Sequence, residues 1–371
     1  MIIVWLEFNL SDLHYIYTFK YNIILINIQP IEEFIKSVEK HPTIDVRSPS
    51  EFSHAFIPTA KNICLLNDEE RKVVGIKYKK EGNQAAVVLG YDLVGTKFST
   101  FIKKALDIAI NNEINVYCWR GGLRSNIMAF VLHTAGFKVN LLKGGYKAFR
   151  NWTRLVLQTQ KKIIIIGGKT GSGKTLIIES LREKGEQVIN LEAIANHKGS
   201  AFGALGQLPQ PSNEQFENIL ALLWNKIDCN KSLWLENESR TIGSNVIPLS
   251  IFEQMREAIT LNIQIPQDER INYIIQEYGC FAKNELITNT TKIKKRLGNL
   301  RLEQTLEYLN QDNIEAWAIM MLEYYDKSYI YGNSKREDNS IVSFDFNNLD
   351  ANSIAEKLIE WEKNYDKVNT V

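Results

Sequence analysis

The chain has 371 residues, with 44 Lys and Arg against 43 Asp and Glu, which gives a formal net charge of +1. This length corresponds to about two domains, and 44% hydrophobic with 23% charged residues excludes a disordered or fibrous protein. The near-neutral charge also excludes a uniformly polybasic protein, so a nucleic-acid partner would have to be held by local basic patches.

Four cysteines are spread along the chain without a CxxC pair: Cys64, Cys118, Cys229 and Cys280. This spacing is not typical of a disulfide framework or a cysteine-rich zinc site, so we predict reduced thiols, no metal site and a cytoplasmic location. We interpret Cys64, Cys229 and Cys280 as structural, because their surroundings are neither glycine-rich nor basic. No run reaches the roughly 18 apolar residues of a membrane span, so no membrane partner is expected.

The sequence predicts an N-terminal extension, 1–28, followed by two domains, 29–155 and 160–371. The extension is apolar and aromatic, but it lacks the basic start and the small-residue cleavage site of a signal peptide. It is either an added strand or a poorly ordered segment, and the sequence does not separate these interpretations. The second domain is expected to end in helical segments that contact tRNA, for reasons given below.

Short apolar runs alternate with helical patterns in both domains, which predicts the α/β class with mostly parallel sheets. In the first domain we expect strands at 43–46, 116–118 and 139–142 and helices at 31–39, 125–135 and 146–160. In the second domain we expect strands at 163–166, 187–191, 232–236, 261–265 and 341–346, with helices at 174–183 and 351–365 among others.

The first candidate site is a cysteine at the end of an expected strand. Cys118 is followed by a glycine-containing turn and then a helix, which directs backbone N–H groups and the positive end of the helix dipole at the sulfur. These surroundings favour the thiolate, the nucleophilic form of cysteine. Cys118 is therefore the candidate catalytic residue, and the supporting loop comprises Arg120, Gly121, Gly122, Arg124 and Ser125.

The segment DVRSPSEF at 45–52, followed by IPTA at 57–60, resembles the start of a rhodanese domain, whose active cysteine lies some tens of residues later. Thr59 stands where that family usually has glycine, a departure that affects loop packing rather than sulfur chemistry. Asp45 and Arg47 are expected to form an ion pair beneath the active loop. The first domain is therefore expected to be rhodanese-like.

The spacing Cys-x5-Arg-Ser that starts at Cys118 is also that of cysteine phosphatases, and the spacing alone does not separate the two families. Tyr117 stands where phosphatases usually have histidine. Together with the rhodanese-like segment upstream, this favours chalcogen transfer, while phosphatase activity stays an alternative.

The second candidate site is a phosphate-binding loop in a P-loop NTPase-like domain. Residues 168–175, GKTGSGKT, fit G-x4-G-K-[ST] between an expected strand and an expected helix, as this motif requires. Lys174 would reach the terminal phosphates, and the hydroxyl of Thr175 can hold Mg²⁺. The expected diphosphate-binding residues are Gly168, Gly171, Ser172, Gly173, Lys174 and Thr175.

Further polar residues are candidates for a second part of this site. Glu236 ends an expected strand, where many P-loop proteins carry the acid that binds magnesium, although such acids can also simply cap a loop. His197 is a weaker candidate for a general base than Lys198 is for a phosphate contact. The candidates at this second part are His197, Lys198, Glu236, Glu238 and Arg240.

Several segments are explained by neither generic domain: 65–71, 75–79, 118–125, 195–203, 210–212, 215–218 and 236–243. In this order, around a rhodanese-like domain and a P-loop, they resemble tRNA 2-selenouridine synthase over about residues 30–331. The resemblance implies a transferase that replaces the sulfur of 2-thiouridine at the tRNA wobble position with selenium, by way of S-geranyl-2-thiouridine. It implies selenophosphate and geranyl diphosphate as co-substrates and no tightly bound cofactor, with a role for Mg²⁺ left open.

Under this resemblance Cys118 matches the family's essential cysteine, which either carries selenium or assists the displacement. The P-loop would hold the diphosphate of the geranyl donor, or selenophosphate. The implied partners are tRNA and the enzyme that makes selenophosphate. Two alternatives remain: a sulfurtransferase or cysteine phosphatase fused to an ATP-using module, and an RNA-binding scaffold, which the intact Cys118 loop and P-loop disfavour.

A tRNA partner requires basic surface. One cluster on an expected C-terminal helix comprises Lys283, Lys292, Lys294, Lys295, Arg296 and Arg301. A second cluster marks the interdomain connector and comprises Lys143, Lys147, Arg150, Arg154, Lys161 and Lys162. Each cluster alone is equally well explained as a solvated helix face. Trp119 is a candidate for stacking on a flipped base, and a core position explains it equally well.

Overall fold

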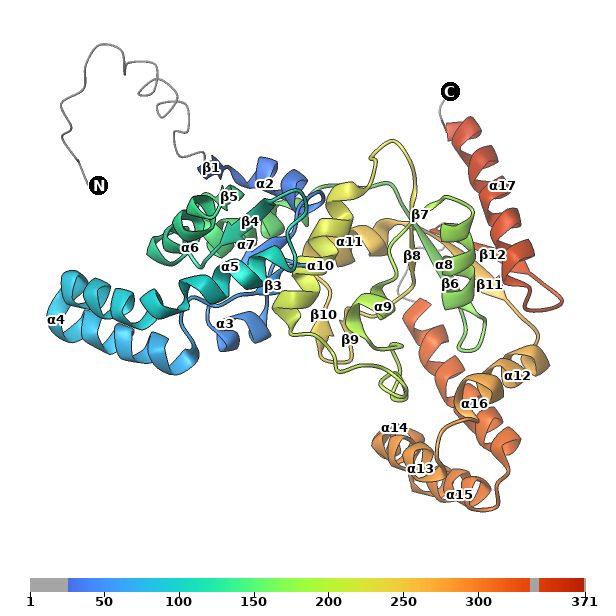
Figure 1. The fold of residues 1–371 in the computed structure, drawn as a ribbon. Coiled ribbons are helices and arrows are strands. Elements are labelled where there is room, and N and C mark those ends of the chain that lie inside the picture. The colour runs from blue at the N-terminus through green and yellow to red at the C-terminus, as the bar shows by residue number, and fades with distance from the viewer. Residues whose placement is uncertain (1–25, 334–339, 370–371) are drawn as a thin grey trace, which may run out of the picture. The chain divides into compact units, whose positions relative to one another are not determined.

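The computed structural model describes residues 26–333 and 340–369, and the chain divides into two compact units between Trp152 and Thr153. Figure 1 shows the elements of both units. The expected extension, 1–28, lies outside the described residues except for 26–28, which belong to the first strand. The predicted α/β class is confirmed, because each unit contains a five-stranded sheet whose strands pair in parallel.

The sheet of the first unit has the order β1-β5-β4-β2-β3. Its strands are β1 (Ile26–Gln29), β2 (Thr43–Asp45), β3 (Lys61–Asn62), β4 (Glu113–Tyr117) and β5 (Lys138–Leu142). Its helices are α2 (Ile31–Val38), α3 (Pro49–His54), α4 (Asp68–Val94), α5 (Phe98–Leu106), α6 (Leu123–Thr134) and α7 (Gly145–Val156). Apolar residues of the central strands and of α5 and α6 form one buried core, which fixes the end of β4 where Cys118 follows.

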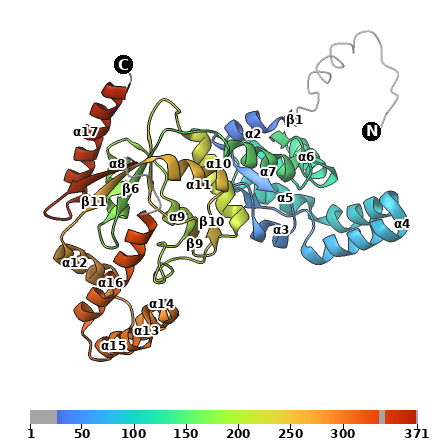
Figure 2. The ribbon, with the colours of Figure 1, turned by 180° about the vertical axis from the view of Figure 1, so that it is seen from behind.

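Helix α4 is an insertion that the sequence analysis did not predict. It breaks at Gly82, whose φ of 87° is a left-handed conformation that suits glycine, and its two arms lie side by side in both views (Figures 1 and 2). The stretch Asp68–Leu106 is long and apolar enough, by length and composition, to cross a membrane, and 17% of its most apolar window is buried. One such stretch is a weak indication, and the break at Gly82 lies inside it.

The sheet of the second unit has the order β12-β11-β6-β8-β7. Its strands are β6 (Ile163–Gly168), β7 (Gln187–Val188), β8 (Leu233–Glu236), β11 (Ile259–Gln264) and β12 (Ile341–Asp345), and a separate hairpin consists of β9 (Thr241–Ile242) and β10 (Asn245–Val246). The helices next to the sheet are α8 (Lys174–Glu183), α9 (Leu191–Ala195), α10 (Asn213–Lys226), α11 (Leu249–Glu257) and α17 (Ala351–Asn369). Helices α8 and α17 pack together and share a buried core with the sheet.

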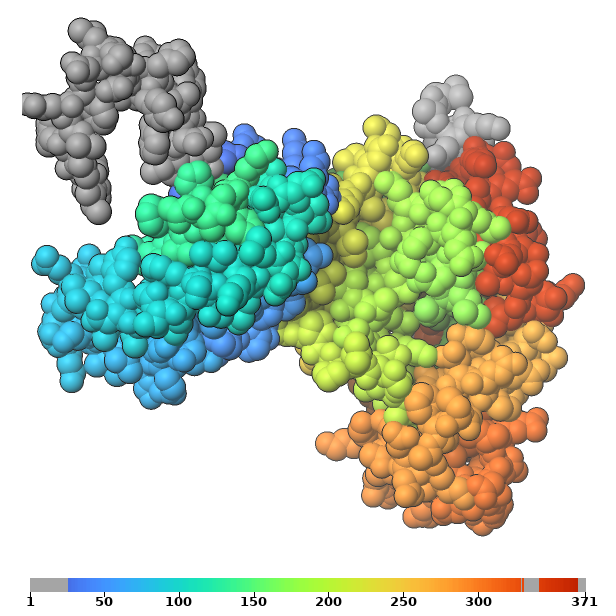
Figure 3. All heavy atoms as spheres, in the orientation of Figure 1, coloured from blue at the N-terminus to red at the C-terminus, as the bar shows by residue number. Residues whose placement is uncertain are grey.

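Between β11 and β12 the chain forms a helical lobe with a core of its own. The helices are α12 (Gln267–Tyr278), α13 (Lys283–Lys292), α14 (Lys294–Leu297), α15 (Asn299–Asn310) and α16 (Ile314–Asn333). Trp317 is 1% exposed and packs edge-on against Phe202, which lies in the loop after α9. Figure 3 shows this lobe in orange as a projecting part of the second unit.

The predicted strands and helices lie close to the observed ones, with two informative differences. The expected strand at 187–191 is wrong beyond Val188, because the Asn190 side chain accepts a hydrogen bond from the Ala193 amide and starts helix α9 instead. The expected strand at 116–118 ends at Tyr117, which leaves Cys118 in the following loop.

Candidate functional site

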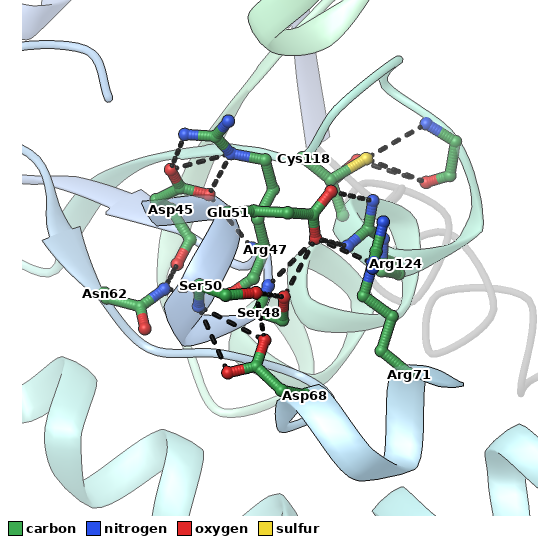
Figure 4. A network of polar contacts seen from close by, with 12 residues as sticks. Asp45, Arg47, Ser48, Ser50, Glu51, Asn62, Asp68, Arg71, Cys118 and Arg124 are labelled. Carbon is green, nitrogen blue, oxygen red and sulfur yellow. Dashed lines mark hydrogen bonds and ion pairs between the residues drawn. The ribbon is translucent and has the colours of Figure 1, made fainter. Parts of the chain in front are cut away.

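Cys118 follows the carboxyl end of β4, and its thiol contacts two hydrogen-bond donors and one acceptor, the Gly122 carbonyl at 4.0 Å (Figure 4). The Gly122 amide donates to Sγ at 3.3 Å, and the Ser125 hydroxyl donates to it at 3.1 Å. Both groups belong to the turn and the first residues of α6, so the end of a helix is directed at the sulfur as predicted. The loop borders a hollow of about 260 Å³ that Trp119 and Arg120 also line.

A second glycine-containing turn, at Gly144 and Gly145, packs against the Cys118 loop. Gly121 has φ of 65°, and a Cβ atom there would lie 2.8 Å from the amide nitrogen of Gly144. The amide of Tyr146 donates to the Cys118 carbonyl at 2.8 Å, and the amide of Lys147 donates to the Trp119 carbonyl at 2.9 Å. The backbones pack so closely that a side chain at Gly121 would displace the loop, which explains why glycine is needed at this position.

The expected ion pair between Asp45 and Arg47 is confirmed. Arg47 Nε lies 3.0 Å and 2.9 Å from the two carboxylate oxygens of Asp45, and both residues are at most 1% exposed. Arg47 also donates to the Ala55 carbonyl at 2.7 Å, and its guanidinium carbon lies 3.9 Å from the centre of the Tyr146 ring. Trp119 packs on Tyr146 and remains 38% exposed. The Asp45–Arg47 pair therefore supports one side of Trp119 through Tyr146 and leaves the rest of Trp119 accessible.

Glu51 connects the active loop to α4, a role that the sequence analysis missed. Arg124 Nη1 lies 2.7 Å from Glu51 Oε2, and Arg71 Nε lies 3.1 Å from the same oxygen (Figure 4). Burial alone would raise the pKa of Glu51, but the hydrogen bond and charge of Arg124 hold it below its usual value. Arg124 is therefore bound to a carboxylate at the edge of the loop, while Arg120 is exposed beside the hollow.

The P-loop occupies the end of β6 and the start of α8, as predicted. Lys174 Nζ donates to the Gly168 carbonyl at 2.9 Å, and Gly173 has φ of 70° at the beginning of the helix. The Ser172 hydroxyl is buried and has no hydrogen-bond partner among the described residues. From the helical lobe, Arg270 Nε donates to the Thr170 carbonyl at 2.8 Å, which joins α12 to the apex of the loop. An unpartnered buried hydroxyl inside a glycine cradle fits a loop built for an anion.

Three carboxylates lie around the P-loop lysine: Glu192, Glu236 and Glu238. Thr175 Oγ1 donates to Glu192 at 3.2 Å, and the Glu192 amide donates to Glu236 Oε1 at 2.9 Å. Burial raises the pKa of Glu236 to about 7, and burial with the neighbouring acids raises the pKa of Glu238 well above its usual value. Glu192 was not predicted, because it stands on a short helix away from any motif.

In the described part of the chain, no group of three or more His, Cys, Asp or Glu side chains is arranged to hold a metal ion. Lys174 lies among these acids: burial lowers its pKa, while the charges of Glu238 and Glu192 act to raise it.

The raised pKa of Glu236 predicts a pH-dependent stability. Folding favours the neutral acid, so its contribution is complete below about pH 4.5 and is lost as the pH rises through about 7. We expect the unfolding free energy to fall between about pH 5 and about pH 8, and this fall to be smaller by up to about 3 kcal/mol in Glu236→Gln. The glutamine oxygen can still accept from the Glu192 amide. Urea unfolding across this range measures the difference, and parallel pH curves would contradict the assignment.

The other residues predicted for the second part of the P-loop site do not all lie in the cluster of Glu192, Glu236 and Glu238. Lys198 is ion-paired with Glu277 of α12, and its role as a phosphate contact stays a prediction. The His197 ring packs against Gly203, and burial, with the nearby charge of Lys292, lowers the pKa of His197. Arg240 is exposed in the loop after β8, where its carbonyl accepts from the amide of Ile247.

Among the described residues, only some of the basic side chains in the two predicted clusters are exposed and unpaired with an acid. Arg150 is 8% exposed, so its predicted place on a basic surface is wrong. Lys283 pairs with Asp312 at 2.6 Å and Arg301 with Glu323 at 3.6 Å. The exposed remainder of the C-terminal cluster consists of Lys292, Lys294, Lys295 and Arg296.

The cysteines outside the active loop need one correction. Cys229 and Cys280 are exposed, so a buried structural role is wrong for both, whereas Cys64 is half-buried. Burial raises the pKa of the Cys64 thiol, which disfavours its reactive thiolate form.

Comparisons with known proteins match both units. Residues 30–152 match the rhodanese-like domain family, and residues 161–357 match the family described as the tRNA 2-selenouridine synthase AAA domain. The chain is 38% identical over 327 residues to a tRNA 2-selenouridine synthase of Sulfurovum sp. (strain NBC37-1), covering 78% of this chain and 88% of that protein. It is 35% identical over 347 residues to a protein of the same name from Hydrogenovibrio crunogenus (strain DSM 25203 / XCL-2), covering 82% and 93%. The chain therefore belongs to the tRNA 2-selenouridine synthase family.

Proposed function

We propose that this protein converts 2-thiouridine in tRNA to 2-selenouridine, with geranyl diphosphate and selenophosphate as co-substrates, in the cytoplasm. The observation that carries the proposal is that one chain of this family combines a cysteine held among hydrogen-bond donors with a P-loop. The two sites suit two different steps, a displacement at a diphosphate and a displacement at a chalcogen-bearing carbon.

In the first step the sulfur of 2-thiouridine attacks C1 of geranyl diphosphate. The S–C bond forms, the C–O bond breaks, diphosphate departs with the electron pair, and the base loses its N3 proton. The residues proposed to hold the diphosphate are those of the P-loop, where backbone amides and Lys174 stabilise the departing anion. The buried Ser172 hydroxyl, which has no partner among the described residues, is free to donate to it.

In the second step the selenium of selenophosphate adds to C2 of the S-geranylated base. The C2–Se bond forms, the C2–S bond breaks, and geranylthiol leaves with the electron pair and a proton. Water then cleaves the P–Se bond and releases phosphate. Cys118 is the proposed catalytic residue of this step, where it assists the departure of the geranylthiol. The Gly122 amide and the Ser125 hydroxyl would stabilise negative charge on its sulfur.

The test is mass spectrometry of nucleosides from a 2-thiouridine tRNA incubated with the protein, geranyl diphosphate and selenophosphate. We expect 2-thiouridine to decline while S-geranyl-2-thiouridine appears first and 2-selenouridine follows. Unchanged nucleosides from the folded protein would reject the proposal, and assays of phosphatase and ATP turnover would then examine the alternative function.

The exposed basic residues of α13 and α14 are the proposed tRNA contact. Each phosphate contact adds about 0.9 to the slope of log affinity against log salt, so replacing Lys294, Lys295 and Arg296 by alanine should reduce that slope by up to about 3. Lys363 on α17 is also exposed, and Lys363→Ala is the control. Filter binding of tRNA over a salt series measures the slopes, and an unchanged slope in the triple variant would remove the lobe from the interface.

A further inference from the structure

A groove of the first unit that has no assigned role lies between the two arms of α4 and the start of α6. Its volume is about 560 Å³, within the range of about 300–1,000 Å³ that small-molecule sites occupy. Its lining is mainly aliphatic and includes Leu65, Val74, Ile76, Val87 and Ile127. The side chain of Ile76 remains 45% exposed. Apolar surface left open in this way marks a site for an apolar ligand.

The groove is a neighbour of the hollow at Cys118, and the two spaces share a wall. Leu123 and Arg124 line both spaces, and Leu123 is 49% exposed between them. When an apolar group lies in the groove, a short link is therefore enough to place the atom that carries this group at the sulfur of Cys118.

Two glycines on facing arms keep the groove open. Gly75 and Gly90 both line it, and a Cβ atom at either position would meet nothing within 4 Å. Neither has the left-handed φ that requires glycine, and glycine destabilises a helix interior relative to alanine. Since packing in the described chain does not demand them, the missing side chains leave room for a bound molecule.

The charged side chains at the rim of the groove indicate the kind of molecule to which the apolar group is attached. Among the described residues, the lining contains four basic side chains, Arg71, Lys72, Lys79 and Arg124, and no acidic one. Arg71 and Arg124 are paired with Glu51 outside the groove, which leaves Lys72 and Lys79 for an external anion. An apolar floor with a cationic rim complements an aliphatic chain attached to a polyanion.

We propose that this groove binds the geranyl chain of S-geranyl-2-thiouridine in tRNA while C2 of that base lies at Cys118. This inference rests on the proposed function, and it locates the chain in the second step rather than at the P-loop. The groove makes the geranyl group a recognition element as well as part of the leaving thiol.

The test uses anticodon stem-loop RNA that carries either S-geranyl- or S-methyl-2-thiouridine, with selenophosphate and the full chain. The wild type should convert the geranyl substrate with a kcat/KM roughly 10- to 100-fold higher than the methyl substrate. Gly90→Phe and Gly75→Phe should reduce this ratio to near one while retaining conversion of the methyl substrate. Gly95→Phe is the matched control, because Gly95 is exposed in the same insertion, has open space around it and does not line the groove.

An unchanged ratio in both groove variants, or no preference in the wild type, would overturn the groove assignment and leave the proposed function intact. A wild type that converts 2-thiouridine directly and ignores the geranyl substrate would instead reject the S-geranyl route, and the groove assignment with it. If the phenylalanine variants do not fold, the wild-type protein is crosslinked to RNA that carries a photoreactive S-prenyl group. The position of the crosslink then tests the groove assignment. Crosslinks within 65–94 or 123–127, the segments that line the groove, are expected, and crosslinks confined to other segments would overturn the assignment.

Discussion

Replacing Cys118 by alanine is expected to abolish 2-selenouridine while S-geranyl-2-thiouridine accumulates. The sulfur is the only heavy atom that this substitution removes, and it is the atom to which the Gly122 amide and the Ser125 hydroxyl donate. Removal of a catalytic side chain that acts together with such partners lowers a rate by about a thousandfold or more. Nucleoside mass spectrometry with both co-substrates would show the geranylated base as the final product.

Two controls make this result specific. Cys280→Ala should retain full conversion, because Cys280 is an exposed thiol outside the active loop. Ser125→Ala removes one donor to the sulfur while keeping the thiol, so the selenation rate should fall by a smaller factor than in Cys118→Ala. Selenation that continues at the wild-type rate in Cys118→Ala would remove Cys118 from the chemistry. Loss of geranylation as well would point to a structural role.

The main outlines of both sites could be predicted because local sequence determines them. The loop after β4 needs glycine at Gly121 for its left-handed backbone and close packing, and the P-loop is a continuous motif between a strand and a helix. The Asp45–Arg47 pair was also predictable, since the two residues are near neighbours at the end of one strand.

Partners that are distant in the sequence could not be predicted. Glu51 and Arg71 meet Arg124 only because α3, α4 and α6 converge, and no spacing rule links them. Glu192 likewise reaches Thr175 from a five-residue helix. The pairing of Lys198 with Glu277 was not foreseen either, because Glu277 lies on a helix of the lobe. Tertiary ion pairs therefore decided which charged candidates remain available for ligands.

The α4 insertion was missed for a related reason. Its first arm begins with the Asn67 capping box, a readable signal, but a glycine-interrupted pattern with apolar residues on exposed surface resembles neither a core helix nor a loop. The same features that obscure it in the sequence, Gly75, Gly90 and exposed aliphatic side chains, are those from which the groove is inferred.

Replacing Lys174 by alanine should have the opposite effect to Cys118→Ala. Geranylation should fall by roughly 100-fold or more, because the variant loses the ammonium that we propose stabilises the departing diphosphate. Selenation of RNA that is already S-geranylated should continue at close to the wild-type rate, since that step is assigned to Cys118. The measurement is the rate of each step separately, with 2-thiouridine RNA in one reaction and S-geranyl-2-thiouridine RNA in the other.

Lys169→Ala is the matched control within the same loop. Its side chain is 46% exposed and lies 3.8 Å from Asp326, so its loss removes a positive charge from the P-loop without emptying the buried position. Lys174→Ala also leaves Glu192 and Glu238 without their buried cation, so unfolding in urea should be recorded beside the rates. Equal losses in both reactions from a folded Lys174→Ala protein would contradict the division of labour, because one site would then serve both displacements. A geranylation defect alone, absent from Lys169→Ala, would assign the diphosphate to the P-loop and the exchange of sulfur for selenium to the rhodanese-like unit.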